Sequence, residues 1–295
     1  MNYKTKGRTV FNIFNYIILV CAALICLLPF VNLFAVSLSG NSAVAAGRVY
    51  FWPVEFTLQS YLFALQGDHF LRALWVSCQR VIIGVSVNLL LMILVAYPLS
   101  KNKSQLIGRN IYMGMFVVTM LINGGLVPTF LVVTNLGLMN SIWALILPGA
   151  LPVFSMLILM NFIRSMPGEL EEAALVDGAG PLGALIYIVL PLMKPALATV
   201  GLFAIVTHWN EWFSGMIYMQ NPNNYPLQTY LQTLITRFEQ LMRLAGADFT
   251  KLLRVMNVRT GRAAQIFLAA IPVMLIYPFL QKYFVTGLVI GSVKG

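Results

Sequence analysis

The stretch Ser165-Met-Pro-Gly-Glu-Leu-Glu-Glu-Ala-Ala-Leu-Val-Asp-Gly-Ala-Gly180 lies between two long apolar segments and contains four of the nine acidic residues of the chain. Pro167 suits the first turn of a helix, and the acidic residues after it complement the positive charge of a helix N-terminus. Gly178 and Gly180 can end a helix. The stretch therefore predicts a short helix that lies outside the apolar segments.

One face of this short helix is suited to close contact with a partner, because its alanines are small. Three-and-four spacing places the following residues on that face: Leu170, Ala173, Ala174 and Asp177. Glu171 and Glu172 flank it. After the helix, Pro191 and Pro195 should kink the chain where it enters the next apolar segment.

The whole chain has the composition of a membrane protein. Of its 295 residues, 59% are hydrophobic and 9% are charged, and the mean hydropathy is +0.83, which excludes a soluble globular protein. A bilayer crossing needs roughly 20 apolar residues. Six segments are long enough, at about 11–38, 71–99, 110–133, 142–163, 196–219 and 263–282. The sequence predicts an all-α integral membrane protein with six transmembrane helices and a short cytoplasmic helix between spans four and five.

Basic residues near the ends of spans predict the orientation, since they stay cytoplasmic. One side carries Lys4, Lys6, Arg8, Lys101, Lys103, Arg109, Arg164, Lys194, Lys282 and Lys294. We expect both termini on the cytoplasmic side. The expected parts are an N-terminus over 1–10, a membrane domain over 11–285 and a tail over 286–295. The membrane domain includes the loop 165–195 and an outer loop over 220–262, whose six basic residues count against this orientation.

The remaining composition argues against several kinds of site. Cys21, Cys26 and Cys78 lie in or beside apolar stretches without metal-ligand spacing, and His69 and His208 are the only histidines, so we expect no metal site. The net charge of +10 comes from basic residues scattered among loops, which does not indicate nucleic-acid binding.

The loop resembles a known family. Glu172-Ala173-Ala174, Gly178, Ile188 and Leu190-Pro191 are spaced as in the signature loop of permease subunits of bacterial ABC importers, and Asp177 and Ala179 resemble its carbohydrate branch. The alternative for the loop is an ordinary amphipathic interfacial helix. The resemblance implies that ATPase subunits contact the following residues: Glu172, Ala173, Ala174, Asp177, Gly178, Ala179, Leu190 and Pro191.

Other stretches are similar to the same carbohydrate branch: Asn123-Gly124-Gly125-Leu126, Gly137-Leu138, Trp209-Asn210-Glu211 and the tail 287–295. By similarity to the maltose importer, we expect a second permease subunit, in a heterodimer in preference to a homodimer, two ATPase subunits and an extracytoplasmic solute-binding protein. The implied substrate is a sugar or oligosaccharide, and the implied location is the bacterial plasma membrane. The chain lacks a phosphate-cradling glycine-rich loop, so ATP is expected on the partners. We expect no cofactor and no catalysis in this chain.

Five residues are candidates for the substrate pathway: Asn123, Trp209, Asn210, Glu211 and Trp212. Indole rings stack on the apolar faces of sugars, and amide and carboxylate groups hydrogen-bond hydroxyl groups. The alternatives are that the tryptophans form an interfacial aromatic belt and that Asn210 and Glu211 hold helices together across the interface between permease subunits. For the Asn123–Gly125 stretch, close helix packing is favoured over a kink beside a cavity.

The outer loop is a candidate contact for the solute-binding protein, through Asn221, Asn224 and Tyr225 and through a helical pattern of leucines after them. A helix lying on the bilayer is the alternative. The basic residues of this loop would favour an anionic oligosaccharide or, equally, an acidic surface of the binding protein.

Three other functions stay open at this point. One is an ABC permease for a different small polar solute. An ion-coupled secondary carrier would need intramembrane charges, for which Glu211 is the candidate. An intramembrane enzyme would need a metal motif, or a nucleophile with its base, which the sequence lacks.

Overall fold

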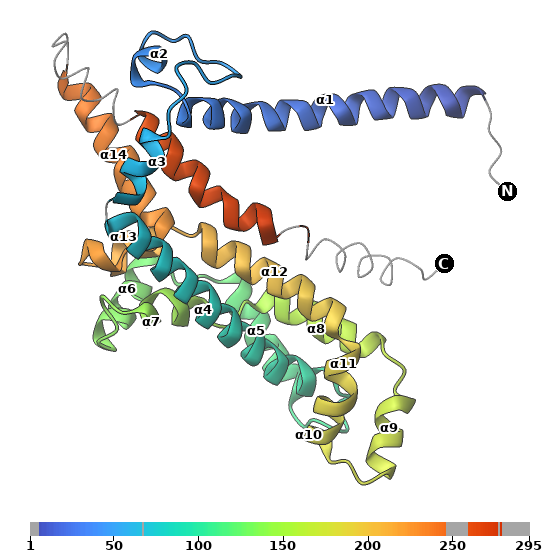
Figure 1. Cartoon of the computed structure of the whole chain (residues 1–295). Helices are drawn as coiled ribbons and strands as arrows, with labels where there is room; N and C mark the ends of the chain where they lie inside the picture. Colours follow the sequence, from blue (N-terminus) through green and yellow to red (C-terminus); the bar gives the residue numbers. More distant parts are fainter. Residues whose placement is uncertain (1–5, 67, 246–258, 277, 279–295) are drawn as a thin grey trace. The chain divides into compact units, whose positions relative to one another are not determined.

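The computed structural model describes residues 6–66, 68–245, 259–276 and 278 (Figure 1). Every regular element in these ranges is a helix, which confirms the all-α class. The expected tail 286–295 lies outside the described residues, as do residues 1–5. The chain forms two compact units, Met1–Leu71 with Leu231–Ile271 and Arg72–Tyr230 with Pro272–Gly295.

The first unit contains α1 (Lys6–Ser37), α2 (Asn41–Ala45), α3 (Gln59–Gln66), most of α14 (Leu227–Ala245) and most of a helix over Arg259–Ile276. The apolar side chains of α1 are exposed over most of its length. Its C-terminal end packs on α2 and on the Arg259–Ile276 helix, with the Phe34 and Phe267 ring centroids 4.8 Å apart. The leucine pattern of the outer loop correctly predicts a helix in the region of α14.

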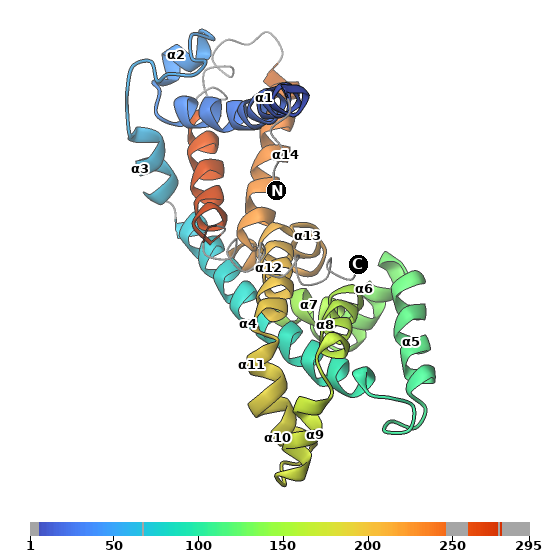
Figure 2. The same cartoon turned by 90° about the vertical axis from the view of Figure 1, so that its right-hand side faces the viewer.

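The second unit is built around α4 (Asp68–Ser100), α8 (Val153–Ser165) and α12 (Lys194–Asn210). These three helices share one core, to which they contribute Met92, Met156, Leu159 and Val200, all 0% exposed. Around them lie α5 (Arg109–Leu121), α6 (Leu126–Asn135), α7 (Ile142–Ile146), η1 (Leu147–Gly149), α9 (Glu169–Val176), α10 (Pro181–Ala184), η2 (Leu185–Val189), α11 (Leu190–Leu192), α13 (Phe213–Tyr218) and η3 (Pro222–Asn224). Within this unit, α9 and α10 lie side by side (Figure 2).

Among the described residues, α1, α4 and the Arg259–Ile276 helix are each long and apolar enough to cross a membrane. Three bent helix pairs bring the number of candidate spans to as many as six, if each pair is one span. Apolar side chains such as Ile82 and Leu90 on α4 are exposed. A surface of this kind suits lipid or another membrane helix.

The predicted third span, 110–133, is not one straight helix. The α5 and α6 segments meet at an angle of 112° across Ile122–Gly125. The Asn123 side chain accepts a hydrogen bond from the Gly125 N–H at 2.9 Å, and Gly125 has φ +86°, so the break is a local turn. A Cβ atom at Gly125 would meet nothing within 4 Å. No described residue of this chain packs closely against Gly125, and the close helix packing expected at these glycines stays a prediction.

Two further bends lie in the predicted fourth and fifth spans. The α7–η1 segment meets α8 at 52°, and Pro181–Leu192 meets α12 at 79°. The second bend lies at Met193, between Pro191 and Pro195, as the prolines predict. The fifth helix ends at Asn210, short of the predicted 219, because Glu211 adopts an extended backbone before the separate helix α13.

Candidate functional site

The predicted short helix is present as α9. It begins at Glu169, two residues after Pro167, and its acidic first turn matches the prediction. At its other end Gly178 has φ +84°, and the Ala179 N–H donates across it to the Ala174 carbonyl at 2.9 Å. This bond is typical of a glycine-terminated helix. Gly178 therefore ends the helix, as its position predicts.

The exposed face of α9 differs from the predicted one. Ala174 is buried at 6% exposure and Glu171 is half-buried, whereas Ala173 is exposed and Val176 is 86% exposed. A helix turns by about 100° per residue, so Glu171 and Ala174 lie on the opposite side from Ala173 and Val176. Ala174 thus packs inside the chain. A partner could reach the outer face of α9, which consists of Glu172, Ala173, Val176 and Asp177.

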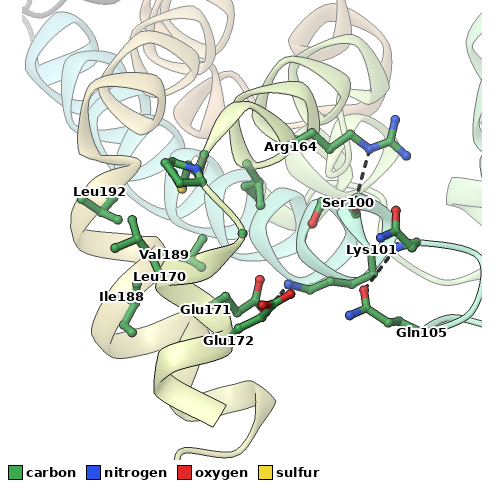
Figure 3. Close-up of a pocket in the computed structure, with 15 residues that line it drawn as sticks. Ser100, Lys101, Gln105, Arg164, Leu170, Glu171, Glu172, Ile188, Val189 and Leu192 are labelled. Carbon is green, nitrogen blue, oxygen red and sulfur yellow. Dashed lines mark hydrogen bonds and ion pairs between the residues drawn. The ribbon is translucent and has the colours of Figure 1, made fainter. Parts of the chain in front are cut away.

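Polar side chains from the end of α4 and the residue directly after it hold the inner face of α9. The Tyr97 hydroxyl donates to Glu171 Oε1 at 2.6 Å and lies 3.0 Å from the Pro181 carbonyl oxygen. Lys101 forms an ion pair with Glu171, and its Nζ lies 4.0 Å from the centroid of the Tyr97 ring. We call Tyr97, Lys101 and Glu171 the α9 clamp. Figure 3 shows the Lys101 side chain reaching toward the two adjacent glutamates of α9.

The charge on Glu171 is stabilised by this arrangement. Burial raises its pKa, but the hydrogen bonds from Lys101 and Tyr97 and the charge of Lys101 lower the pKa by more, so it lies below its ordinary value. A carboxylate whose pKa is lowered by folding stabilises the fold at any pH above its ordinary pKa. This stabilisation is lost as the pH falls through the lowered pKa. Glu171 is therefore ionised throughout the neutral range.

A cavity of about 500 Å³ lies beside the clamp (Figure 3). It is lined by the end of α4 and the loop after it, by the end of α8, by α9 and by the η2–α11 segment. Arg164 borders it and hydrogen-bonds the carbonyl groups of Ser100 and Leu99 at 3.3 and 3.4 Å. On the side of α9 that borders this cavity, the attachment is made by the polar contacts of the clamp, whereas Ala174 packs inside the chain.

The segment after α9 contains the remaining residues of the predicted loop site. Leu190 is half-buried and Pro191 is exposed. Pro191 lacks an N–H and would crowd the carbonyl four residues earlier in a regular helix, and here the preceding turn widens into the π-helix η2. Tyr187 and Leu182 are 79% and 65% exposed. Val176, Leu182 and Tyr187 are exposed apolar side chains that sequence reasoning missed.

Glu211 pairs with a buried cation. Arg80 on α4 is 3% exposed, and its guanidinium donates to Glu211 Oε2 at 2.6 Å and to the Glu211 carbonyl at 2.9 Å. Ser214 N–H donates to the other carboxylate oxygen at 2.8 Å. Glu211 therefore holds the end of α12 to α4 within one chain, whereas the packing alternative placed such contacts at the permease interface. Sequence reasoning missed Arg80, although an arginine inside a predicted span is an unusual and costly feature.

The other residues proposed for a substrate pathway differ in how exposed their side chains are. Trp209 is buried at 5% exposure, while Asn210 is exposed and its amide donates to the Val206 carbonyl at 2.9 Å. Trp212 is 38% exposed and packs edge-on against Phe213, with ring centroids 5.7 Å apart. Asn123 is exposed at the break between α5 and α6.

A second cavity, of about 330 Å³, lies next to the Arg80–Glu211 pair. His208 and Asn88 border it, and His208 Nε2 lies 2.7 Å from Asn88 Oδ1. The Asn88 amide also donates to the carbonyl groups of Gly149 and Ala150 at 3.0 and 2.7 Å. These polar groups join α4 and α12 to the bend before α8.

The outer-loop residues predicted to contact the binding protein pack against a turn of the same unit. The Asn221 N–H donates to Asn140 Oδ1 at 3.3 Å, and the Asn224 amide donates to the same oxygen at 3.2 Å. Tyr225 packs against the cluster that contains Tyr218 and Val133. The two loops therefore lie on one side of the unit, as two outer loops would. Asn221 keeps an exposed side chain, while Asn224 and Tyr225 are half-buried.

Among the described residues, no group of three or more His, Cys, Asp or Glu side chains could hold a metal ion.

Comparisons with known proteins support one kind of function, although no family model matches the chain. The Bacillus subtilis polygalacturonan/rhamnogalacturonan transport system permease protein is 39% identical over 98% of this chain and 100% of its own length. The arabinooligosaccharides transport system permease of Halalkalibacterium halodurans is 26% identical over 92% of this chain and 93% of its own. A crystal structure of a bacterial ABC transporter that imports the acidic polysaccharide alginate has a chain 30% identical to this one, with a TM-score of 0.86, covering 96% of this chain and 100% of that one.

Proposed function

This chain belongs to the permease subunits of bacterial ABC transporters that import sugars, and from this we propose that it forms half of a transmembrane pathway for an acidic oligosaccharide. Two similar proteins support this substrate class: the polygalacturonan/rhamnogalacturonan permease and the alginate importer. Both polygalacturonan and alginate carry carboxylates. The net charge of +10 favours an anionic solute. A neutral oligosaccharide is the second candidate, supported by the arabinooligosaccharide permease.

We propose that α9 is the cytoplasmic coupling helix that docks on an ATPase subunit. The observation that carries this proposal is the exposure of Ala173 and Val176 on a helix whose other face is held by the clamp. The small Ala173 permits close approach, and the apolar Val176 would be buried on docking. Glu172 and Asp177 flank this surface and would pair with basic groups of the ATPase.

We propose that the three bent helix pairs are single broken spans, which gives six crossings and places both termini in the cytoplasm. The positions of Lys101, Arg164 and Glu171 near one another support a common side for these loops. The remaining partners are a second permease subunit, two ATPase subunits that bind the ATP, and an extracytoplasmic binding protein that contacts the outer loop. Asn221 is the exposed member of the three loop residues.

Substrate contact in this subunit is best assigned to Trp212 and Asn210, because their side chains are exposed while Trp209 is buried and Glu211 is paired. Replacing Trp212 with Ala should lower uptake at subsaturating sugar by about fivefold, since one aromatic contact contributes roughly 0.5–1.5 kcal/mol. Trp212→Phe keeps a ring and should retain most of the uptake. Equal loss in both variants, or none in either, would contradict the assignment. The measurement is initial uptake rate against sugar concentration.

The experiment that tests the function uses the complex purified through a tag on this chain and reconstituted in liposomes. Uptake of a labelled oligogalacturonide should require the binding protein outside and ATP on the ATPase side. Uptake that needs an ion gradient and no ATP would instead establish a secondary carrier. ATP-driven uptake of neutral oligosaccharides alone would keep the permease assignment and overturn the substrate class.

A further inference from the structure

Two adjacent glutamates of α9 border the same cavity but have different partners (Figure 3). Glu172 is exposed, and it forms no ion pair within the described part of the chain. Glu171 is half-buried and is held by Tyr97 of α4 and by Lys101, the residue directly after α4. The chain has only nine acidic residues, and these two neighbours are placed for different tasks.

The inner contact connects α9 to a helix that is far from it along the chain. Going forward in sequence, α9 reaches α12 through α10, η2 and α11, and that route contains a π-helix and the 79° bend at Met193. Both features interrupt the regular helix, so this route is not one straight element. The clamp instead reaches α4, whose Tyr97 is itself 7% exposed and belongs to the core that α4, α8 and α12 share.

The clamp is strong enough to act as a mechanical link. The Lys101 and Glu171 side chains are 17% and 25% exposed, so water and salt screen this pair less than a surface ion pair. Tyr97 donates a second, charge-assisted hydrogen bond to the same carboxylate oxygen. The 500 Å³ cavity lies beside the clamp, between α9 and the ends of α4 and α8, so the clamp connects α9 to the end of α4 across a side that packing does not fill.

We infer that Glu171 is a positioning residue that fixes the coupling helix to α4 through Lys101 and Tyr97, so that a movement of α9 is transmitted to the α4 core directly. This inference rests on the proposed role of α9 in docking the ATPase. In this arrangement Glu172 helps to bind the ATPase, and Glu171 transmits the movement of the ATPase to the helices in the membrane. Loss of the clamp leaves ATP hydrolysis running while α4 no longer follows α9.

The test compares Glu171→Gln with Glu172→Gln in the reconstituted complex and measures uptake and ATP hydrolysis on the same liposomes. Glu171→Gln should lower the sugar taken up per ATP by about tenfold, a typical size for coupling between sites, with the ATPases still bound. Glu172→Gln should instead reduce the amount of ATPase that co-purifies. Tyr97→Phe should have a smaller effect on coupling than Glu171→Gln, because the ion pair remains.

A charge exchange separates this role from a general effect on folding. Glu171→Lys and Lys101→Glu should each lower the uptake per ATP, and the double variant Glu171→Lys/Lys101→Glu should recover most of it. An unchanged uptake per ATP in Glu171→Gln overturns the inference, as does a double variant that assembles with the ATPases but stays uncoupled. Absence of ATP-driven uptake in the unmodified complex would overturn the proposed function itself, which is a different result.

Discussion

Replacing Gly178 with Val should abolish transport while the protein still inserts into the membrane. Gly178 has φ +84°, and a side chain in this region of the backbone costs roughly 1–2 kcal/mol, with β-branched residues the least tolerated. A Cβ atom would meet nothing within 4 Å, so the cost comes from the backbone alone. With valine at this position, the backbone would leave the left-handed region, and the end of α9 and the docking face would move with it.

Gly180 supplies a matched control two residues away. Its φ is −66° and its ψ is 172°, values that valine adopts readily, and a Cβ atom there also meets nothing within 4 Å. Gly180→Val should therefore retain transport, and Gly178→Asn should retain part of it because asparagine tolerates the left-handed region. Uptake and ATPase co-purification are the readouts. Equal activity of Gly178→Val and Gly180→Val would sink the proposed importance of the helix end.

Removing Arg80 should destabilise the protein more than any surface substitution. The change Arg80→Met leaves the Glu211 carboxylate without its cation. Loss of one partner of a fully buried pair costs roughly 3–5 kcal/mol, and we expect a somewhat smaller cost here because Glu211 is 30% exposed and still accepts a hydrogen bond from the Ser214 N–H. That cost is a large part of the stability of an average protein domain. We expect the thermal midpoint of the purified protein in detergent to fall by more than about 5 °C. Size-exclusion chromatography after heating measures it.

The double variant Arg80→Met/Glu211→Met identifies the cause of that loss. With both charges removed, much of the stability should return, because the unpaired carboxylate is gone. Arg72→Met is the matched control, since Arg72 is an exposed arginine of the same helix, and it should change the midpoint little. If Arg80→Met has the same thermal midpoint as the unmodified protein, the pair has no structural importance. If the double variant melts as low as the single one, Arg80 acts through its carbonyl partners instead.

Local signals in the sequence predicted the parts of the site that depend on local chemistry. A proline followed by acidic residues and then by a glycine predicted α9 and its end at Gly178. Two prolines predicted the bend at Met193. Composition alone predicted a helical membrane protein. These features follow from the preferences of individual residues for backbone conformations and for helix termini.

Features that depend on distant contacts could not be predicted in the same way. Arg80 and Glu211 are 131 residues apart, and the sequence drew attention to the glutamate alone. The predicted contact face of α9 included Ala174, because spacing along the sequence shows which residues share a face of a helix. Whether that face is buried depends on the elements that pack against it, which the spacing does not show. The space around Gly125 likewise depends on neighbours that only the fold reveals.

The different partners of Glu171 and Glu172 make α9 sensitive to its register. Inserting or deleting one residue before them would rotate the helix by about 100° and turn the inner carboxylate away from Lys101 and Tyr97. A chimaera made to recruit the ATPase of another importer should therefore exchange outer-face residues such as Ala173 and Val176, and keep Glu171, Ala174 and the length of the helix. The choice of ATPase and the attachment of α9 to the rest of the chain can then be engineered separately, although both depend on the same eight-residue helix.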